Sequence, residues 1–213
     1  MENIYCISGL GADERIFRKL DIKGAKLIFL PWVSYDKHDE LGCYAQKMAA
    51  QIPEKNPTVL GLSFGGMLAT EIANQQPVKR VFLVSSAKGK NELPEVNNTI
   101  KFLVEKNLLP YGLFKKPNKI LYSQFGAETE EEKELLTAIM HDTDPDFLGW
   151  AFKAILGWQN STVPKNVIHI HGTGDKIITP ANVDANYWIN EGTHMMVYSK
   201  AKDISKILGE HLV

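Results

Sequence analysis

The sequence predicts an α/β fold in which helices cover both faces of a mostly or wholly parallel sheet of about six strands. Short apolar runs alternate with longer stretches whose apolar residues recur at helical spacing. Runs that are almost continuously apolar are typical of strands covered on both faces. Strands that alternate with helices are joined by right-handed crossovers, which make neighbouring strands parallel. With 213 residues, 44% of them hydrophobic and 23% charged, we expect one domain over residues 1–213.

The first half of the chain supplies four of these strands. They are expected at residues 3–8, 26–30, 58–62 and 79–85. Gly9 ends the first strand and Pro31 ends the second. The helices between them are expected at residues 14–20, about 40–52 and 67–76.

The alternation stops between residues 88 and 164, where helical patterns follow one another without a strand. The expected helices are marked by Ile100, Leu103, Val104 and Leu108; by residues 117–125; by Leu135, Leu136, Ile139 and Met140; and by residues 147–158. Two have clear N-terminal signals, a capping box that starts at Thr129 and an Asp144-Pro145 N-cap. Strands resume at residues 166–171 and 184–189, before a closing helix at 203–211. We therefore interpret residues 88–164 as a helical insertion that lies on the sheet.

Charge, hydropathy and cysteine content argue against several classes of protein. A net charge of −1 gives no electrostatic reason to expect nucleic acid or an acidic membrane surface as a partner. No run reaches the roughly 18 apolar residues that a membrane span needs, and residues 1–3 lead directly into strand-like sequence rather than a secretory leader. Cys6 and Cys43 lack metal-site spacing. We expect two buried, reduced thiols in a soluble cytoplasmic protein.

The sequence Gly61-Leu62-Ser63-Phe64-Gly65 lies between the third strand and the helix that follows it. In a Gly-x-Ser-x-Gly turn of this kind the serine hydroxyl stands out above the sheet, and the glycines let neighbouring backbone pass closely. Chance supplies such a pentapeptide in roughly one of every twenty chains of this length. Its meaning therefore depends on whether the chain also supplies a base, an orienting acid and oxyanion donors.

Three loops beyond the ends of predicted strands supply such groups. Asp175 follows the 166–171 strand, His194 follows the 184–189 strand, and Gly9-Leu10-Gly11 follows the first strand. In open parallel sheets the functional residues lie on loops beyond the carboxyl ends of the strands. The chain order of Ser63, Asp175 and His194 is also one that a known group of serine hydrolases uses.

Other acids and histidines offer alternatives. Asp142, Asp144 and Asp146 are rival acids, but they fall in the helical insertion, where helix capping accounts for Asp144. His169 and His171 alternate along one strand and suggest metal ligands. No third ligand follows at metal-site spacing, which favours packing for both.

Gly9-Leu10-Gly11 also has the position of a dinucleotide-binding turn. The third glycine of that fingerprint is absent, because Glu14 stands there, and the second strand ends without an acidic residue. We therefore reject a nucleotide cofactor. His38, His141 and His211 are interpreted as surface or loop residues.

Taken together, these motifs resemble those of the α/β-hydrolase superfamily over nearly the whole chain. The resemblance rests on residues 8–11, 61–66, 171–175 and 192–194. It implies that Ser63 is the nucleophile, that His194 is the general base and then acid, and that Asp175 orients His194. Backbone N–H groups of Leu10 and Phe64 would form the oxyanion hole. Residues 88–164 would correspond to the cap that such enzymes insert after their sixth strand.

The chain departs from the family pattern in two places. The family commonly begins with two further antiparallel strands, which this chain lacks. The resemblance therefore implies a six-stranded parallel sheet in the order 4-3-5-6-7-8, in the family's strand names. The second departure is Ser8-Gly9, which stands where the family often has His-Gly; that histidine is not catalytic.

The implied activity is hydrolysis of a carboxylic ester or thioester of a small-molecule acyl substrate, through an acyl-enzyme on Ser63 and without a metal or organic cofactor. The alternatives are a non-catalytic small-ligand-binding protein on the same fold, a C–C bond hydrolase and a cofactor-free perhydrolase. Phe147, Phe152 and Trp158 are expected mostly in the core of the cap, some of them lining an acyl pocket. The sequence leaves the acyl length and the oligomeric state open.

Overall fold

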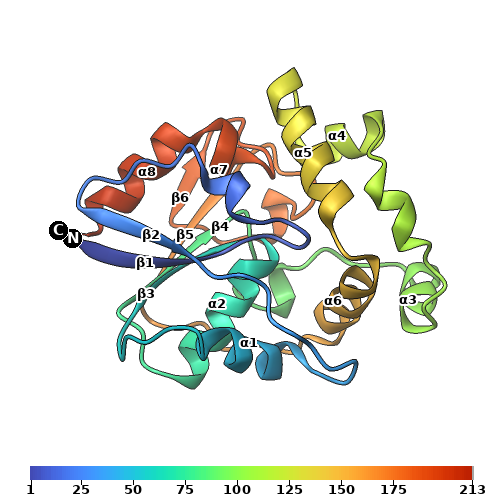
Figure 1. Cartoon of the computed structure of the whole chain (residues 1–213), viewed down its shortest axis with the longest axis horizontal. Coiled ribbons are helices and arrows are strands. Elements are labelled where there is room, and N and C mark those ends of the chain that lie inside the picture. Colours follow the sequence, from blue (N-terminus) through green and yellow to red (C-terminus); the bar gives the residue numbers. More distant parts are fainter. Residues whose placement is uncertain (213) are drawn as a thin grey trace.

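The structure is a computed structural model that describes residues 1–212, with positions 113 and 114 described by their backbone alone. Val213, the last residue of the expected 1–213 domain, lies outside the described residues. A six-stranded sheet forms the centre of the molecule (Figure 1). Its strands are β1 (Glu2–Ile7), β2 (Ala25–Phe29), β3 (Thr58–Leu62), β4 (Arg80–Val84), β5 (Val167–Gly172) and β6 (Tyr187–Ile189).

The strand order is β2-β1-β3-β4-β5-β6, and every neighbouring pair is parallel. This is the order 4-3-5-6-7-8 in family strand names, so the predicted fold class and topology are confirmed. β6 contains three residues and is therefore shorter than the strand expected at residues 184–189. Parallel strands place all their carboxyl ends at one edge of the sheet, where loops from different parts of the chain meet.

Helices cover both faces of the sheet. One face carries α1 (Leu41–Ala49) and α2 (Phe64–Gln75); the other carries α7 (Met196–Ser199), α8 (Ala201–Glu210) and the short 3₁₀ helix η1 (Glu14–Phe17) (Figure 1). Alternation along each strand divides the apolar side chains between two cores. In β1, for example, Tyr5 and Ile7 join the core beneath α1 and α2, and Ile4 and Cys6 join the other.

The segment between β4 and β5, residues 88–164, is called the helical segment below. It contains η2 (Lys90–Glu92), α3 (Asn98–Glu105), η3 (Tyr111–Lys115), α4 (Lys119–Phe125), α5 (Glu130–Asp142) and α6 (Pro145–Gly157). Figure 1 shows these helices at the side of the sheet toward which the strands run. Side chains of α6 join the core of α1 and α2, and side chains of α5 join that of α7 and α8. The helical segment thus packs against both sides of the sheet at its carboxyl edge.

The N-terminal signals of two helices are confirmed. Thr129 accepts the N–H of Glu132, whose carboxylate accepts the N–H of Thr129, which completes a capping box for α5. Asp144 accepts the N–H of Asp146 at the start of α6, with Pro145 in the first turn. Both caps satisfy N–H groups that an α-helix leaves without a partner in its first turn.

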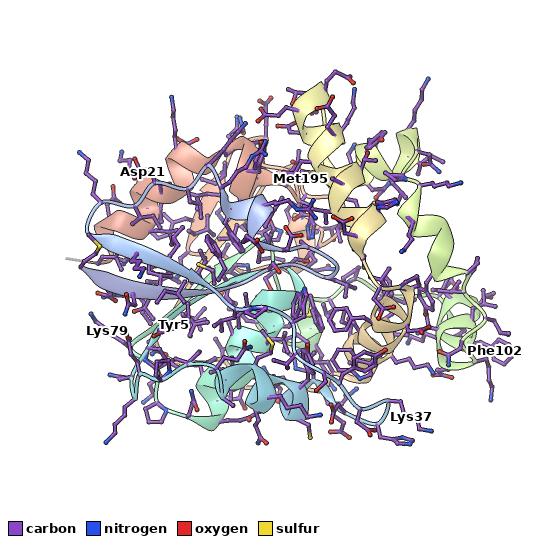
Figure 2. The ribbon with its side chains drawn as sticks, in the orientation of Figure 1. Tyr5, Asp21, Lys37, Lys79, Phe102 and Met195 are labelled. Atoms are coloured by element: carbon purple, nitrogen blue, oxygen red, sulfur yellow. The ribbon has the colours of Figure 1, made fainter. Side chains whose placement is uncertain are left out.

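Three expectations about the elements were wrong. The helix expected at residues 14–20 is a single 3₁₀ turn, and α7 was not predicted. The helix expected to run to Leu108 ends at Glu105, because Asn107 has a left-handed φ of 55°. Ile100 and Leu108, two of the apolar residues that marked this helix in the sequence, are 43% and 58% exposed. Figure 2 shows Phe102, also on α3, at the outer side of the molecule.

The expectation of two buried thiols was also wrong. Cys6 is buried within β1, but Cys43 is exposed on α1. Helical spacing turns Tyr44, Ala45 and Met48 toward the sheet and leaves position 43 on the outer side. Among the described residues, no helix is long and apolar enough to cross a membrane.

Two histidines lie side by side on one face of β5, with ring centroids 5.4 Å apart. His169 and His171 are fully buried. Burial, reinforced by the charges of His171 and Lys88, lowers the pKa of His169 to about 3. Burial likewise lowers the pKa of His171, although its bond to the Ile178 carbonyl opposes the shift. Both imidazoles are therefore neutral at physiological pH.

We predict that the free energy of unfolding falls as the pH drops below about 6.5, where histidines of the unfolded chain take up protons, and goes on falling toward a pH of about 3, where the folded His169 is protonated. Each proton that the unfolded chain binds in excess contributes a slope of about 1.4 kcal/mol per pH unit. Urea unfolding across this range should show a shallower slope in His169→Leu. The exposed His38→Leu serves as the control, and an unchanged slope in His169→Leu would contradict the prediction.

Candidate active site

Ser63 lies at the junction between β3 and α2, on a strained backbone turn. Its φ of 51° and ψ of −119° lie outside the regions that residues with side chains favour. The neighbouring strand holds this conformation from two sides. The Ser63 N–H donates to the carbonyl of Val84 at 2.9 Å, and the Ser86 hydroxyl donates to the Ser63 carbonyl at 2.6 Å. The serine that the pentapeptide predicted thus lies at the carboxyl edge of the sheet.

The glycines around Ser63 allow the backbone to pass at close range. A Cβ atom on Gly61 would collide with the backbone of Gly65 and Gly66. One on Gly65 would collide with the carbonyl oxygens of Ile7 and Ser8, at the end of β1. Glycine is required at both positions, because backbone atoms cannot move aside as a flexible side chain can.

His194 and Asp175 meet Ser63 from the loops that follow β6 and β5. The Nε2 atom of His194 lies 2.9 Å from the Ser63 Oγ. Its Nδ1 atom lies 2.9 and 3.1 Å from the two carboxylate oxygens of Asp175. Asp175 is 2% exposed and His194 is 6% exposed. All three residues that the sequence predicted are therefore joined by one chain of hydrogen bonds.

The turn that carries Asp175 fixes the direction and charge of its carboxylate. Asp175 Oδ1 accepts the N–H groups of Ile177 at 2.9 Å and Ile178 at 3.0 Å. His171 Nε2 donates to the carbonyl of Ile178 at 2.9 Å, which holds the same turn from the strand. Burial alone would raise the pKa of Asp175, but the charge of His194 and these hydrogen bonds outweigh it and lower the pKa. Asp175 is therefore ionised at neutral pH and can orient His194 and stabilise its protonated form.

The loop after β1 forms a tight turn beside Ser63. The Ala12 N–H donates to the Gly9 carbonyl at 2.8 Å, and Gly11 has the left-handed φ of 72° that such a turn needs at its third position. A Cβ atom on Gly9 would lie 3.4 Å from the Ser63 Cβ. The hydrogen bond that closes the turn uses the N–H of Ala12 and does not involve the N–H of Leu10.

Leu10 and Phe64, the two residues predicted to donate backbone N–H groups, line the same cavity as Ser63 and His194. Phe64 is the first residue of α2, so its N–H is among those that a helix leaves without an intrahelical acceptor. The positive end of the helix dipole also lies there, which favours a negative charge near Ser63.

The cavity above Ser63 has a volume of about 670 Å³. Many of its apolar lining residues come from α4, α5 and α6, from Trp158 just after α6, and from the loops that carry Asp175 and His194: Leu121, Phe125, Leu136, Ile139, Met140, Leu148, Phe152, Ile155, Leu156, Trp158, Ile177, Ile178 and Met195. Figure 2 shows Met195 near the boundary between α7 and the helical segment. Charged lining residues, such as Lys90, Glu95 and Lys101, come from the start of the helical segment.

The three aromatic residues singled out from the sequence have different positions. Phe152 and Trp158 line the cavity. Phe147 does not line it and packs against Trp32 and Trp150, in the core beneath α1 and α2, to which Trp158 also belongs. Sequence periodicity gives all three the same helical pattern, so it cannot tell which of them faces a cavity.

The alternative acids and histidines lie elsewhere. Asp142 pairs with Arg15 at 2.7 Å, and Asp144 caps α6 as predicted. His38 and His141 are exposed, whereas His211 is half-buried and bonds the Tyr187 hydroxyl at 2.9 Å. Within the described part of the chain, no group of three or more histidine, cysteine or acidic side chains could hold a metal ion.

Sequence reasoning missed the supporting roles of three residues, of which only His171 belongs to a motif. Ser86 and His171 bond the backbone of the Ser63 and Asp175 turns, and Thr143 bonds the carbonyl of Gly11. A hydroxyl or imidazole in such a position has no signature of its own in a single sequence. His171 alone had a signal, because it precedes Gly172 at the end of a strand that leads to Asp175.

Solved structures with the same fold include two esterase-related proteins and a lactonase. The lipase-esterase related protein from Clostridium acetobutylicum has 16% identity and a TM-score of 0.71, over 98% of this chain and 93% of that one. A thermophilic esterase from Thermogutta terrifontis has 13% identity and a TM-score of 0.73, over 100% and 89%. The enol-lactonase from Burkholderia xenovorans has 16% identity and a TM-score of 0.67, over 99% and 91%. No protein-family model and no curated protein matches the sequence.

We predict that Gly65→Ala destabilises the protein by about 1–3 kcal/mol, because the new methyl group must displace the carbonyls at the end of β1. The matched control is Gly209→Ala in α8, where the added Cβ meets nothing within 4 Å. That variant should be stabilised by roughly 0.5–1 kcal/mol, since alanine favours a helix over glycine. Urea unfolding measures both, and equal effects in the two variants would refute the role assigned to Gly65.

Proposed function

We propose that this chain, whose fold is that of the α/β-hydrolases, is a serine hydrolase that cleaves carboxylic esters or thioesters. The observation that carries the proposal is the chain of hydrogen bonds from Ser63 through His194 to Asp175, at the wall of an apolar cavity. A nucleophile bonded to a base that a buried acid orients is the arrangement that acyl transfer requires.

In the proposed first half-reaction, Ser63 Oγ attacks the carbonyl carbon of the substrate while His194 Nε2 takes its proton. The negative charge of the tetrahedral intermediate falls on the former carbonyl oxygen, which the N–H groups of Leu10 and Phe64 stabilise. One such donor contributes about 10²–10³ in rate. His194 then protonates the departing alcohol or thiol, and the acyl group remains on Ser63.

Water completes the cycle in the second half-reaction. His194 Nε2 takes a proton from the attacking water, the second tetrahedral intermediate collapses, and Ser63 leaves with the proton that His194 returns. Asp175, ionised and hydrogen-bonded to Nδ1, keeps His194 in the tautomer that both steps need and stabilises its positive charge.

The helical segment is proposed to act as a cap that selects a small-molecule acyl substrate. The apolar side chains of α4, α5 and α6 fit the hydrocarbon part of an acyl group, and a volume of about 670 Å³ lies within the range of pockets that enclose whole small ligands. We therefore place an acyl chain of several carbons, rather than an acetyl group, against these walls.

We predict that Ser63→Ala keeps the fold but loses turnover of p-nitrophenyl esters by about 10⁶-fold in kcat and no longer reacts with a fluorophosphonate probe. The control is Ser161→Ala, an exposed serine remote from the motifs, which should retain both properties. If the wild-type protein neither hydrolyses esters nor reacts with the probe, the pocket serves binding alone and the proposal fails.

We further predict that kcat/KM rises with acyl length from p-nitrophenyl acetate to the medium-chain esters, by up to about fourfold for each methylene that enters the cavity. The increase should stop where the chain fills the space beneath the helical segment. The measurement is kcat/KM from steady-state kinetics over a series of esters and thioesters with acyl chains of about two to twelve carbons. A preference for acetate over octanoate would contradict the placement of the acyl chain.

A further inference from the structure

The junction between α5 and α6 contacts the turn that follows β1. Thr143 is the C-cap residue of α5, is 7% exposed, and lines the cavity. Its hydroxyl lies 2.7 Å from the carbonyl oxygen of Gly11 and 2.8 Å from that of Ile139. A side chain of the helical segment therefore bonds directly to the turn that holds Leu10.

The contact is closely fitted. A Cβ atom on Gly11 would lie 2.7 Å from the Thr143 Oγ1 and 2.8 Å from its Cγ2, so the glycine backbone packs directly on the threonine side chain. Gly11 also needs its left-handed φ of 72° to close the turn. The hydroxyl has a single proton, which the carbonyls of Gly11 and Ile139 share.

Donors hold the carbonyls of Gly9, Gly11 and Ala12 in this turn. The Gly9 carbonyl accepts the N–H of Ala12 at 2.8 Å. The Ala12 carbonyl accepts the Ser8 hydroxyl at 2.6 Å and the Trp32 indole N–H at 2.9 Å. Those donors belong to the sheet and its first loops, whereas the donor to Gly11 comes from the helical segment. The Gly11 anchor is thus the one that depends on the position of α5.

We propose that Thr143 is a positioning residue that sets the direction of the Leu10 N–H toward the oxyanion by anchoring the Gly11 carbonyl. The inference rests on the function proposed above. It gives the helical segment a part in the rate of acyl transfer, in addition to its part in binding the acyl chain. The effect of losing the hydroxyl should therefore fall on kcat, where the oxyanion forms, and hardly on KM.

The test compares two substitutions at one position. Thr143→Val keeps the shape and removes the hydroxyl, whereas Thr143→Ser keeps the hydroxyl and removes the methyl group. We expect a loss of about 10- to 100-fold in kcat for valine, because a donor displaced by about 1 Å can cost 10²-fold. Serine should stay within about threefold of wild type in kcat, and KM should change less than about threefold in both.

Thr137→Val is the matched control, because Thr137 makes the same kind of bond to the preceding turn of α5. Its hydroxyl donates to the Lys133 carbonyl at 2.6 Å and also contacts the Tyr122 hydroxyl, and it does not line the cavity. A general weakening of α5 would lower the activity of Thr137→Val and Thr143→Val alike. The proposal requires the loss in kcat at Thr143 alone.

A second readout separates oxyanion placement from a structural role. An alkyl trifluoromethyl ketone forms a tetrahedral adduct on Ser63, whereas the secondary alcohol obtained by reducing its carbonyl group has no electrophilic carbon and binds without one. Thr143→Val should weaken the binding of the ketone by the same factor as it lowers kcat/KM, and it should leave the binding of the alcohol unchanged. Equal losses for both ligands, or equal kcat in the valine and serine variants of an active enzyme, would overturn the proposal.

Hydrogen–deuterium exchange of residues 9–13 tests the contact independently of activity. Exchange should be faster in Thr143→Val than in Thr143→Ser, and equal rates would overturn the proposal even in a protein that hydrolyses no ester. If the wild-type protein has no esterase activity but Thr143→Ser still exchanges more slowly than Thr143→Val, the proposed function fails while the contact between Thr143 and the Gly11 carbonyl is supported. If the valine variant does not fold, Thr143→Ala removes the same hydroxyl without a branched side chain.

Discussion

The close approach of two strand ends is the constraint on which the rest of the site depends. The end of β1 passes the start of α2 at a distance that only glycine permits at position 65, so the turn after β1 must lie beside Ser63. The same approach leaves Ser63 in a backbone conformation that Val84 at the end of β4 and Ser86 just beyond it hold by hydrogen bonds. Ser63 and the turn after β1 are therefore positioned by one packing relation rather than by two separate ones.

A second close approach positions Asp175 and His194. A Cβ atom on Gly172 would collide with the carbonyl of Gly192, so the loops after β5 and β6 run in direct contact. The N–H of Gly174 donates to that same carbonyl at 2.9 Å. Asp175 comes just after Gly174, and His194 comes two residues after Gly192. The contact between the two loops therefore holds these side chains within hydrogen-bonding distance of each other. The electrostatics agree with this, since the buried carboxylate stays charged because of the partners brought to it.

The fold and the three central residues were predictable because their signals are local. Apolar runs mark the strands, and Ser63, Asp175 and His194 each follow a predicted strand with a glycine within two residues. Features that depend on packing between distant segments were not predictable. The different positions of Phe147 and Phe152, one in the core beneath α1 and α2 and the other at the cavity, follow from which segments pack against them. The same holds for Ser86 and Thr143, whose partners are backbone carbonyls.

The insertion of the helical segment between two adjacent strands has a consequence for how such a molecule can diversify. The entropic cost of closing a connection grows with the logarithm of its length, so doubling that length costs about 0.6 kcal/mol. β4 and β5 can therefore tolerate long or short excursions between them while their pairing is kept. Under the proposed function, new substrate preferences can arise by remodelling this excursion without disturbing Ser63, His194 and Asp175. The junction between α5 and α6 is the exception, because Thr143 there bonds the Gly11 carbonyl. An insertion or deletion that moves this junction would also alter the turn after β1.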